Sequence, residues 1–169
     1  MRRLGVFLLA PIPGRVKARL TAEVGPSAAA EVHWQIGRRI VGQVAGSGYH
    51  TTVWFAPAGE AAFVREWLEG LGRIELRPQP PGPLGDRLAH AFARQFADGA
   101  RRAVLIATDS PGIDRHLVTE AFTALATSDV VLGPTPAGGC YLVALREPHP
   151  GLLRGLPGPG PAATAFLVR

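Results

Sequence analysis

Apolar runs of strand length alternate with amphipathic helical segments along most of this chain, and that alternation limits the folds it can adopt. The strand-like runs lie at 4–10, 49–56 and 73–79, and a fourth begins at 101. The helical segments lie at 26–46, 60–72, 84–99 and 115–127. Right-handed crossovers place such helices on the faces of a mostly parallel sheet. The sequence therefore predicts an α/β fold, and 169 residues suit a single domain over 1–169.

The C-terminal part of the chain modifies this pattern. Segment 129–145 holds two short strands joined by a Gly- and Pro-rich turn, which predicts a hairpin and one antiparallel strand in a mixed sheet. Residues 155–169 are also rich in Gly and Pro, and we expect them to be irregular until the last few. Asp114 precedes the helical segment at 115–127 and is its expected cap.

Charge and cysteine content restrict the partners of the chain. Lys and Arg number 18 against 13 Asp and Glu, a formal charge of +5, and Lys17 is the only lysine. Arginine binds phosphates and carboxylates, so anionic small molecules and nucleic acids are both admissible. The lone Cys140 excludes an intrachain disulfide and a cysteine zinc cluster, which fits a cytoplasmic protein. The apolar start at 4–10 is too short to span a membrane, so no membrane partner is expected.

The residues expected to be structural are the histidines, the tryptophans and one helical stripe. The apolar stripe of the helix at 26–46 is expected at Ala29, Val32, Ile36, Ile40 and Val44. No two histidines have metal-ligand spacing, so surface or partly buried positions are expected for His33, His50, His90, His116 and His149. Core packing is expected for Trp34, Trp54 and Trp67.

A basic loop, APIPGRVKARL at 10–20, follows the first predicted strand. Arg15, Lys17 and Arg19 alternate, so their side chains could point the same way if the loop stays extended, and two prolines would stiffen it. Gly14 would permit close approach of a phosphate to the backbone. The loop is either a cradle for the phosphates of a nucleotide or a solvated basic loop, and it lacks the spacing of a P-loop.

Two further polar clusters are expected at the same edge of the sheet, because ligand crevices form beyond the carboxyl ends of parallel strands. Asp109 follows the strand that begins at 101, where it could bind Mg²⁺ or Mn²⁺ or form a turn. Ser110 lacks the neighbours of a catalytic nucleophile. The glycines within 133–141 either admit a substrate or make the hairpin turn, and the two interpretations are compatible.

Three segments together resemble a known family in order and spacing: APIPGRVKARL, LIATDSP and DVVLGPTPAGGCYLVAL. They are similar to the bacterial glycosyltransferase-A-like family known as radical-SAM/selenodomain-associated transferase type 1. That family is related in fold to molybdenum cofactor guanylyltransferase and 2-phospho-L-lactate guanylyltransferase. The resemblance spans residues 3 to about 157.

The resemblance implies a three-layer α/β/α sandwich of the nucleotide-diphospho-sugar transferase (GT-A-like) type. It implies transfer of a glycosyl or nucleotidyl group from a nucleotide sugar or nucleoside triphosphate, with Mg²⁺ or Mn²⁺. Asp109 would bind the metal, and Asp109 and Lys17 would be catalytic. Nucleotide contacts are implied for Ala10, Pro11, Gly14, Arg15, Lys17, Arg19 and Ser110. Substrate contacts are implied for Gly138, Gly139 and Tyr141.

Several positions depart from the family pattern. Ala137 stands where the family has an acidic residue, which weakens the expected metal site, and Pro83 stands where an aspartate is usual. Leu9 and Ala18 replace a basic residue and a threonine, and the C-terminal part is expected to be abbreviated. These differences leave a second interpretation open, a catalytically impaired paralogue that binds a nucleotide or an assembly partner, including a second copy. Nucleic-acid binding is a third, but the arginines are scattered and no binding motif accompanies them.

Overall fold

The computed structural model describes residues 1–46, 48–157 and 161–167. Six strands of these residues form one sheet in the order β3-β2-β1-β4-β6-β5. They are β1 (Arg2–Leu9), β2 (His50–Ala56), β3 (Ile74–Pro78), β4 (Arg102–Ala107), β5 (Val130–Pro134) and β6 (Cys140–Leu145). The pairs β1–β2, β1–β4 and β2–β3 are parallel, whereas β6 runs antiparallel to β4 and β5. The predicted mixed sheet with one antiparallel strand is confirmed.

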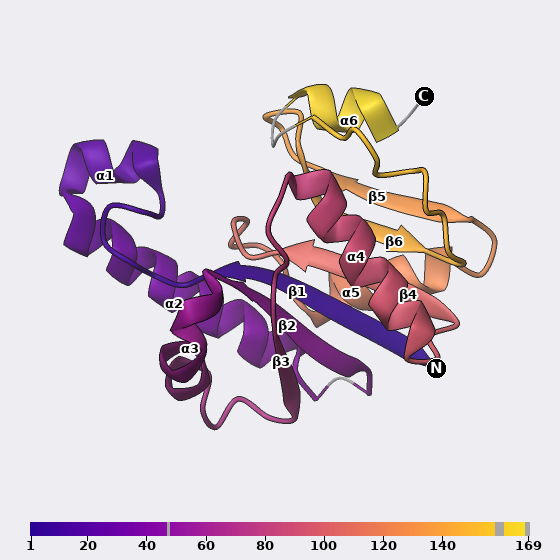
Figure 1. The fold of residues 1–169 in the computed structure, drawn as a ribbon, viewed down its shortest axis with the longest axis horizontal. Helices are drawn as coiled ribbons and strands as arrows, with labels where there is room; N and C mark the ends of the chain where they lie inside the picture. Colours follow the sequence, from indigo (N-terminus) through magenta and orange to yellow (C-terminus); the bar gives the residue numbers. More distant parts are fainter. Residues whose placement is uncertain (47, 158–160, 168–169) are drawn as a thin grey trace.

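Helices cover both faces of this sheet. They are α1 (Ala18–Val24), α2 (Pro26–Val44), α3 (Ala61–Trp67), α4 (Leu84–Ala97), α5 (Arg115–Ala124) and α6 (Pro161–Leu167), with a 3₁₀ turn, η1 (Ala58–Glu60), before α3. Figure 1 shows α4 across one face, with α2 and α5 behind the sheet. Buried apolar side chains from α2, α3 and α5 lie in one hydrophobic cluster, and others from α4 and α6 lie in a second. The fold is therefore the expected three-layer sandwich.

The alternating side chains of β1 divide between these two clusters. Leu4, Val6 and Leu8 are fully buried in the cluster under α2, α3 and α5, whereas Phe7 faces α4. Each such burial contributes about 1.5–3 kcal/mol relative to an exposed side chain. A Cβ added at Gly5 would overlap the Leu105 side chain of β4 and lie 2.7 Å from Gln95 Nε2 of α4, so this glycine leaves room for both side chains.

The buried stripe of α2 differs from the expected one. Val32 is 40% exposed, while His33 and Gly37 occupy buried positions of the stripe. A Cβ on Gly37 would lie 2.8 Å from the ring of Trp67 in α3. His33 belongs to the stripe because it binds a β1 carbonyl, and Gly37 because it packs against the indole of Trp67. Apolar periodicity in the sequence does not reveal either contact.

Two short helices were not predicted. The first, α1, lies within and beyond the basic loop, buries no residue and packs against α2, away from the sheet (Figure 1). The second, α6, lies in the segment expected to be largely irregular, and its Ala163 and Leu167 join the cluster under α4. Proline is tolerated at the first position of a helix, so Pro161 begins α6 rather than preventing it. Within the described ranges, no helix has the length and apolarity needed to cross a bilayer.

Candidate functional site

The carboxyl ends of β1 and β4 lie side by side, since Phe7 pairs with Ala107 in the parallel register. The chain continues in register for one more residue, because Thr108 N donates a 3.2 Å hydrogen bond to Phe7 O. Antiparallel β6 begins at this same edge, as its pairing of Leu142 with Ile106 shows. The loops after β1 and β4 and the β5–β6 turn therefore meet where the sequence predicted.

Lys17 ends the loop after β1 in a left-handed conformation, with φ 52° and ψ 51°. Among the described residues it is the only one other than glycine with a positive φ. This conformation costs a residue with a Cβ about 1–2 kcal/mol, and the neighbouring contacts hold it. Val16 is buried before it, and Thr21 N donates a 2.8 Å hydrogen bond to Lys17 O after it.

This backbone directs the Lys17 side chain toward the end of β4. Its Nζ donates a 3.2 Å hydrogen bond to the main-chain oxygen of Asp109 and lies 3.8 Å from Oδ1 of the same residue. The Lys17 side chain is 20% exposed and that of Asp109 is 75% exposed. An ion pair this exposed stabilises a fold by about 1 kcal/mol or less. The contact confirms that the two loops converge, while the binding roles of both residues stay predictions.

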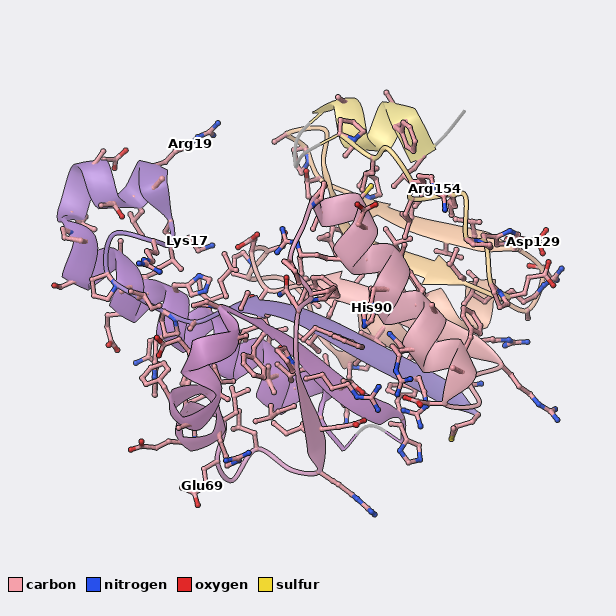
Figure 2. All side chains as sticks on the ribbon, in the orientation of Figure 1. Lys17, Arg19, Glu69, His90, Asp129 and Arg154 are labelled. Atoms are coloured by element: carbon pink, nitrogen blue, oxygen red, sulfur yellow. The ribbon has the colours of Figure 1, made fainter. Side chains whose placement is uncertain are left out.

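The other cations of the basic loop do not share this position. Arg15 N donates a 3.0 Å hydrogen bond to Ile12 O, so the loop turns instead of staying extended, and Gly14 provides a positive φ of 78°. Arg15 is exposed in this turn. Figure 2 shows Arg19 extending from α1 away from the sheet. The three alternating cations were expected to point one way only if the loop stayed extended, and that condition is not met, because a turn and a helix replace the extended segment.

The remaining predicted nucleotide contacts lie close to the strand ends. Ala10 and Pro11 are buried directly after β1, and Ala10 N donates a 2.8 Å hydrogen bond to Ala56 O. They can offer a ligand only main-chain atoms. Ser110 is half-buried beside Asp109 and lines the cavity described next.

A cavity of about 290 Å³ opens beside Asp109. Its lining includes Asp109, Ser110, Thr135 and Tyr141, which have polar side chains. The rest of the wall is mostly apolar and includes Leu84, Leu88, Val143, Leu156, Ala163 and Leu167. Ala137 also lines it, so Asp109 is the only carboxylate among the described lining residues. A pocket of this kind suits an organic ligand with a polar group at the Asp109 side.

Thr135 organises the β5–β6 turn at the rim of this cavity. Its main-chain N donates to Gly139 O at 2.7 Å, and its Oγ1 accepts from Gly139 N at 3.0 Å. Gly138 N donates to Thr135 O at 2.9 Å, and Gly138 has a φ of 84° that favours glycine. The glycines thus make the turn, and Gly139 and Tyr141 also line the cavity, so the two interpretations of this segment are compatible.

Sequence reasoning missed His33, a buried histidine whose pKa responds to the charges of Lys17 and Asp109. Its side chain is 2% exposed, and its Nε2 lies 2.9 Å from Leu9 O at the end of β1. A carbonyl only accepts, so Nε2 carries the proton in this contact. Burial lowers the pKa of His33, the bond to Leu9 and the charge of Asp109 oppose that change, and the Lys17 charge lowers the pKa further. Because its pKa lies below the usual 6.5, His33 is neutral at neutral pH.

Gln79 and Arg87 are a second polar group that sequence reasoning missed. Gln79 follows β3 and is buried, and its Nε2 donates to Trp54 O at 2.9 Å and to Leu8 O at 3.3 Å. Its Oε1 accepts a 2.7 Å hydrogen bond from Arg87 of α4. The sequence signal that could have identified this group was a polar residue, Gln79, at the end of the predicted strand at 73–79. The pair fixes the ends of β1 and β2 and holds a guanidinium near this edge.

The donor set at the site does not suit a divalent cation held by protein groups. Mg²⁺ and Mn²⁺ prefer several oxygen ligands, usually including one or two carboxylates. Asp109 is a single carboxylate, and an ammonium already lies beside its Oδ1. The described part of the chain contains no group of three or more His, Cys, Asp or Glu residues placed to hold a metal ion. The metal role of Asp109 stays a prediction.

With the fold and site in view, the chain can be placed among known proteins. It belongs to the family described as "Uncharacterized protein conserved in bacteria (DUF2064)", whose profile matches residues 41–158. No curated protein matches the chain. The narrower resemblance to the radical-SAM/selenodomain-associated group stays a prediction.

Solved structures identify the fold class. The chain is similar to a "putative nucleotide-diphospho-sugar transferase" from Desulfovibrio desulfuricans G20, with a TM-score of 0.89 and 26% identity over 99% of this chain and 74% of that chain. It also matches CMP:2-keto-3-deoxy-manno-octonic acid synthetase complexed with CTP (TM-score 0.45, 13% identity, 88% and 65% of the chains). Apo UDP-glucose pyrophosphorylase matches with a TM-score of 0.42 and 10% identity, over 100% and 88% of the chains. The last two similarities are too low to carry an argument, so the first defines the nucleotide-diphospho-sugar transferase fold.

Proposed function

We propose that this chain binds a nucleotide sugar or a nucleoside triphosphate at the carboxyl edge of β1 and β4 and transfers its glycosyl or nucleotidyl group. The observation that carries the proposal is the contact between Lys17 and Asp109 beside the cavity. The similarity to the Desulfovibrio protein supports the nucleotide class of the ligand.

In this reaction the protein would position the nucleotide and the acceptor and neutralise the charge of the leaving phosphate group. In glycosyl transfer the bond between the sugar carbon and the diphosphate oxygen breaks, a bond to the acceptor oxygen forms, and the acceptor proton passes to solvent. The leaving diphosphate gains negative charge, which the Lys17 ammonium can stabilise through charge-assisted hydrogen bonds. No covalent intermediate with the protein is required, which agrees with the surroundings of Ser110.

The second candidate function is nucleotide binding without turnover. Ala137 favours it, because this residue lines the cavity and leaves Asp109 as the only carboxylate among the described lining residues. Such a protein would keep the fold and the nucleotide site and serve as a binding or assembly partner.

Calorimetric titration with UDP-glucose, GDP-mannose, CTP and GTP tests the proposal. We expect at least one to bind, and Lys17→Gln to weaken that binding by about ten- to hundredfold, the value of a hydrogen bond to a charged group. Arg73→Gln is the matched control, because Arg73 is exposed just before β3, at the opposite edge of the sheet. Absence of binding by all four nucleotides contradicts the proposal.

Turnover separates the two candidate functions. The bound nucleotide is incubated with a small-molecule extract of bacterial cells as the source of acceptors, and ³¹P NMR follows its phosphate groups. Release of nucleoside diphosphate or pyrophosphate that depends on Lys17 supports the transferase. Binding with an unchanged ³¹P spectrum supports the second candidate.

A further inference from the structure

The ammonium of Lys17 is held by the fold at a defined place. The left-handed backbone at Lys17 is fixed between buried Val16 and the first turn of α1, where Thr21 donates to both Val16 O through Oγ1 and Lys17 O through its main-chain N. Most of the Lys17 side chain is covered, since only 20% of it is exposed. A lysine on a mobile loop tip would not show these contacts.

The contact with Asp109 leaves part of the ammonium available. An ammonium has three donor hydrogens, and the 3.2 Å hydrogen bond to Asp109 O uses one. The carboxylate lies at 3.8 Å, too far for a strong hydrogen bond, so it neutralises charge without using a second donor fully. Burial lowers the pKa of His33, whose Nε2 lies 2.9 Å from Leu9 O, so this histidine adds no competing cation at neutral pH.

The same geometry disfavours a metal at this place. A divalent cation bound to Asp109 would share its carboxylate with the ammonium, and like charges on one carboxylate repel. The cavity lining offers no second acid among its described residues, because Ala137 occupies the turn that faces Asp109.

We propose that the Lys17 ammonium, held on the main-chain oxygen of Asp109, takes the place of a divalent cation, so that the chain binds the diphosphate of its nucleotide without metal. This inference rests on the proposed function and makes it more specific. Asp109 then acts through its main-chain carbonyl, which positions Lys17, and its carboxylate is not a metal ligand.

The probe is inorganic pyrophosphate, titrated calorimetrically in EDTA and again in excess Mg²⁺ or Mn²⁺. We expect the wild-type chain to bind pyrophosphate in EDTA. Lys17→Gln should weaken this binding by about ten- to hundredfold, while Arg73→Gln, with the same change in charge, should not weaken it. Thermal unfolding of each variant shows that the protein is folded.

Asp109→Asn provides the sharpest comparison. It keeps the main-chain oxygen that holds Lys17 and removes a negative charge that repels the diphosphate, so metal-free affinity should equal or exceed that of the wild type. A metal ligand would give the opposite result, with binding lost on the same substitution.

The outcomes separate this inference from the proposed function. Binding of pyrophosphate only with metal, or weaker binding by Asp109→Asn in EDTA, overturns the inference. Absence of pyrophosphate binding in every condition also overturns it. If nucleotides still bind with metal in either case, the proposed function stands and only the metal-free mechanism fails.

Discussion

The Nε2 atom of His33 lies 2.9 Å from the main-chain oxygen of Leu9. This hydrogen bond joins α2, on one face of the sheet, to the carboxyl end of the central strand β1. That carbonyl is next to the loop that carries Lys17. The contact therefore links the packing of α2 to the geometry of the site.

This contact predicts a pH dependence of stability. The folded-state pKa of His33 is lowered from 6.5 chiefly by burial, so below about pH 6.5 the unfolded chain binds the proton more readily. The stability contributed by neutral His33 is fully present above that pH and is lost as pH falls through the folded-state pKa. The wild-type urea midpoint should drop more steeply between about pH 7.5 and about pH 5 than that of His33→Gln. Equal pH slopes for the two proteins would contradict this prediction.

The left-handed backbone at Lys17 predicts an unusual preference for glycine. Lys17→Gly and Lys17→Ala both remove the ammonium, but only alanine keeps the steric cost of φ 52°. We expect Lys17→Gly to be more stable than Lys17→Ala by about 1 kcal/mol in urea unfolding. If the alanine variant is equally or more stable, the backbone at this position differs from the one described.

The approach of α2 to Trp67 predicts opposite results for two glycines in the same helix. A Cβ at Gly37 would lie 2.8 and 2.9 Å from the buried Trp67 ring, so Gly37→Ala should destabilise by about 1–3 kcal/mol. A Cβ at exposed Gly42 would meet Leu71 at an ordinary 3.5 Å, so Gly42→Ala should stabilise by about 0.5–1 kcal/mol. Urea unfolding measures both free energies. Stabilisation by Gly37→Ala would show that helix propensity outweighs the contact with Trp67, and destabilisation by Gly42→Ala would contradict the second expectation.

Substitution of Asp98, at the end of α4, should lower the free energy of unfolding more than substitution of a typical surface acid. Its carboxylate lies 2.9 Å from Arg77, 3.6 Å from Arg3 and 3.7 Å from Arg94, and its side chain is 20% exposed. Asp98→Asn should therefore lower the free energy of unfolding by about 1–3 kcal/mol.

The control for Asp98 is Asp129, which pairs with Arg146 at a site where both side chains are much more exposed. Asp129→Asn should change the free energy of unfolding by about 1 kcal/mol or less. If Asp98→Asn and Asp129→Asn lose similar free energies of unfolding, the three arginines do not act together on Asp98.

Much of the fold was predictable because it depends on patterns local in the sequence. The apolar run that became β1, the Gly- and Pro-rich turn between β5 and β6, and the alternation of helices and strands each follow from neighbouring residues. The cap was equally local, since the Asp114 side chain accepts hydrogen bonds from the main-chain N atoms of His116 and Leu117. The mixed sheet and the edge that carries the site follow from the same patterns.

Only the tertiary structure decided which side chains meet at that edge. The sequence allowed three cations to point one way if their loop stayed extended, but the left-handed backbone directed Lys17 to Asp109, 92 positions away, while Arg19 extends outward from α1 (Figure 2). The sequence also did not identify His33 as part of this edge. A histidine within an apolar stripe has a structural role only when another element brings a carbonyl to it, as β1 does here with Leu9 O. Local propensity determines elements, whereas contacts between distant residues depend on packing that brings their backbones within hydrogen-bonding distance.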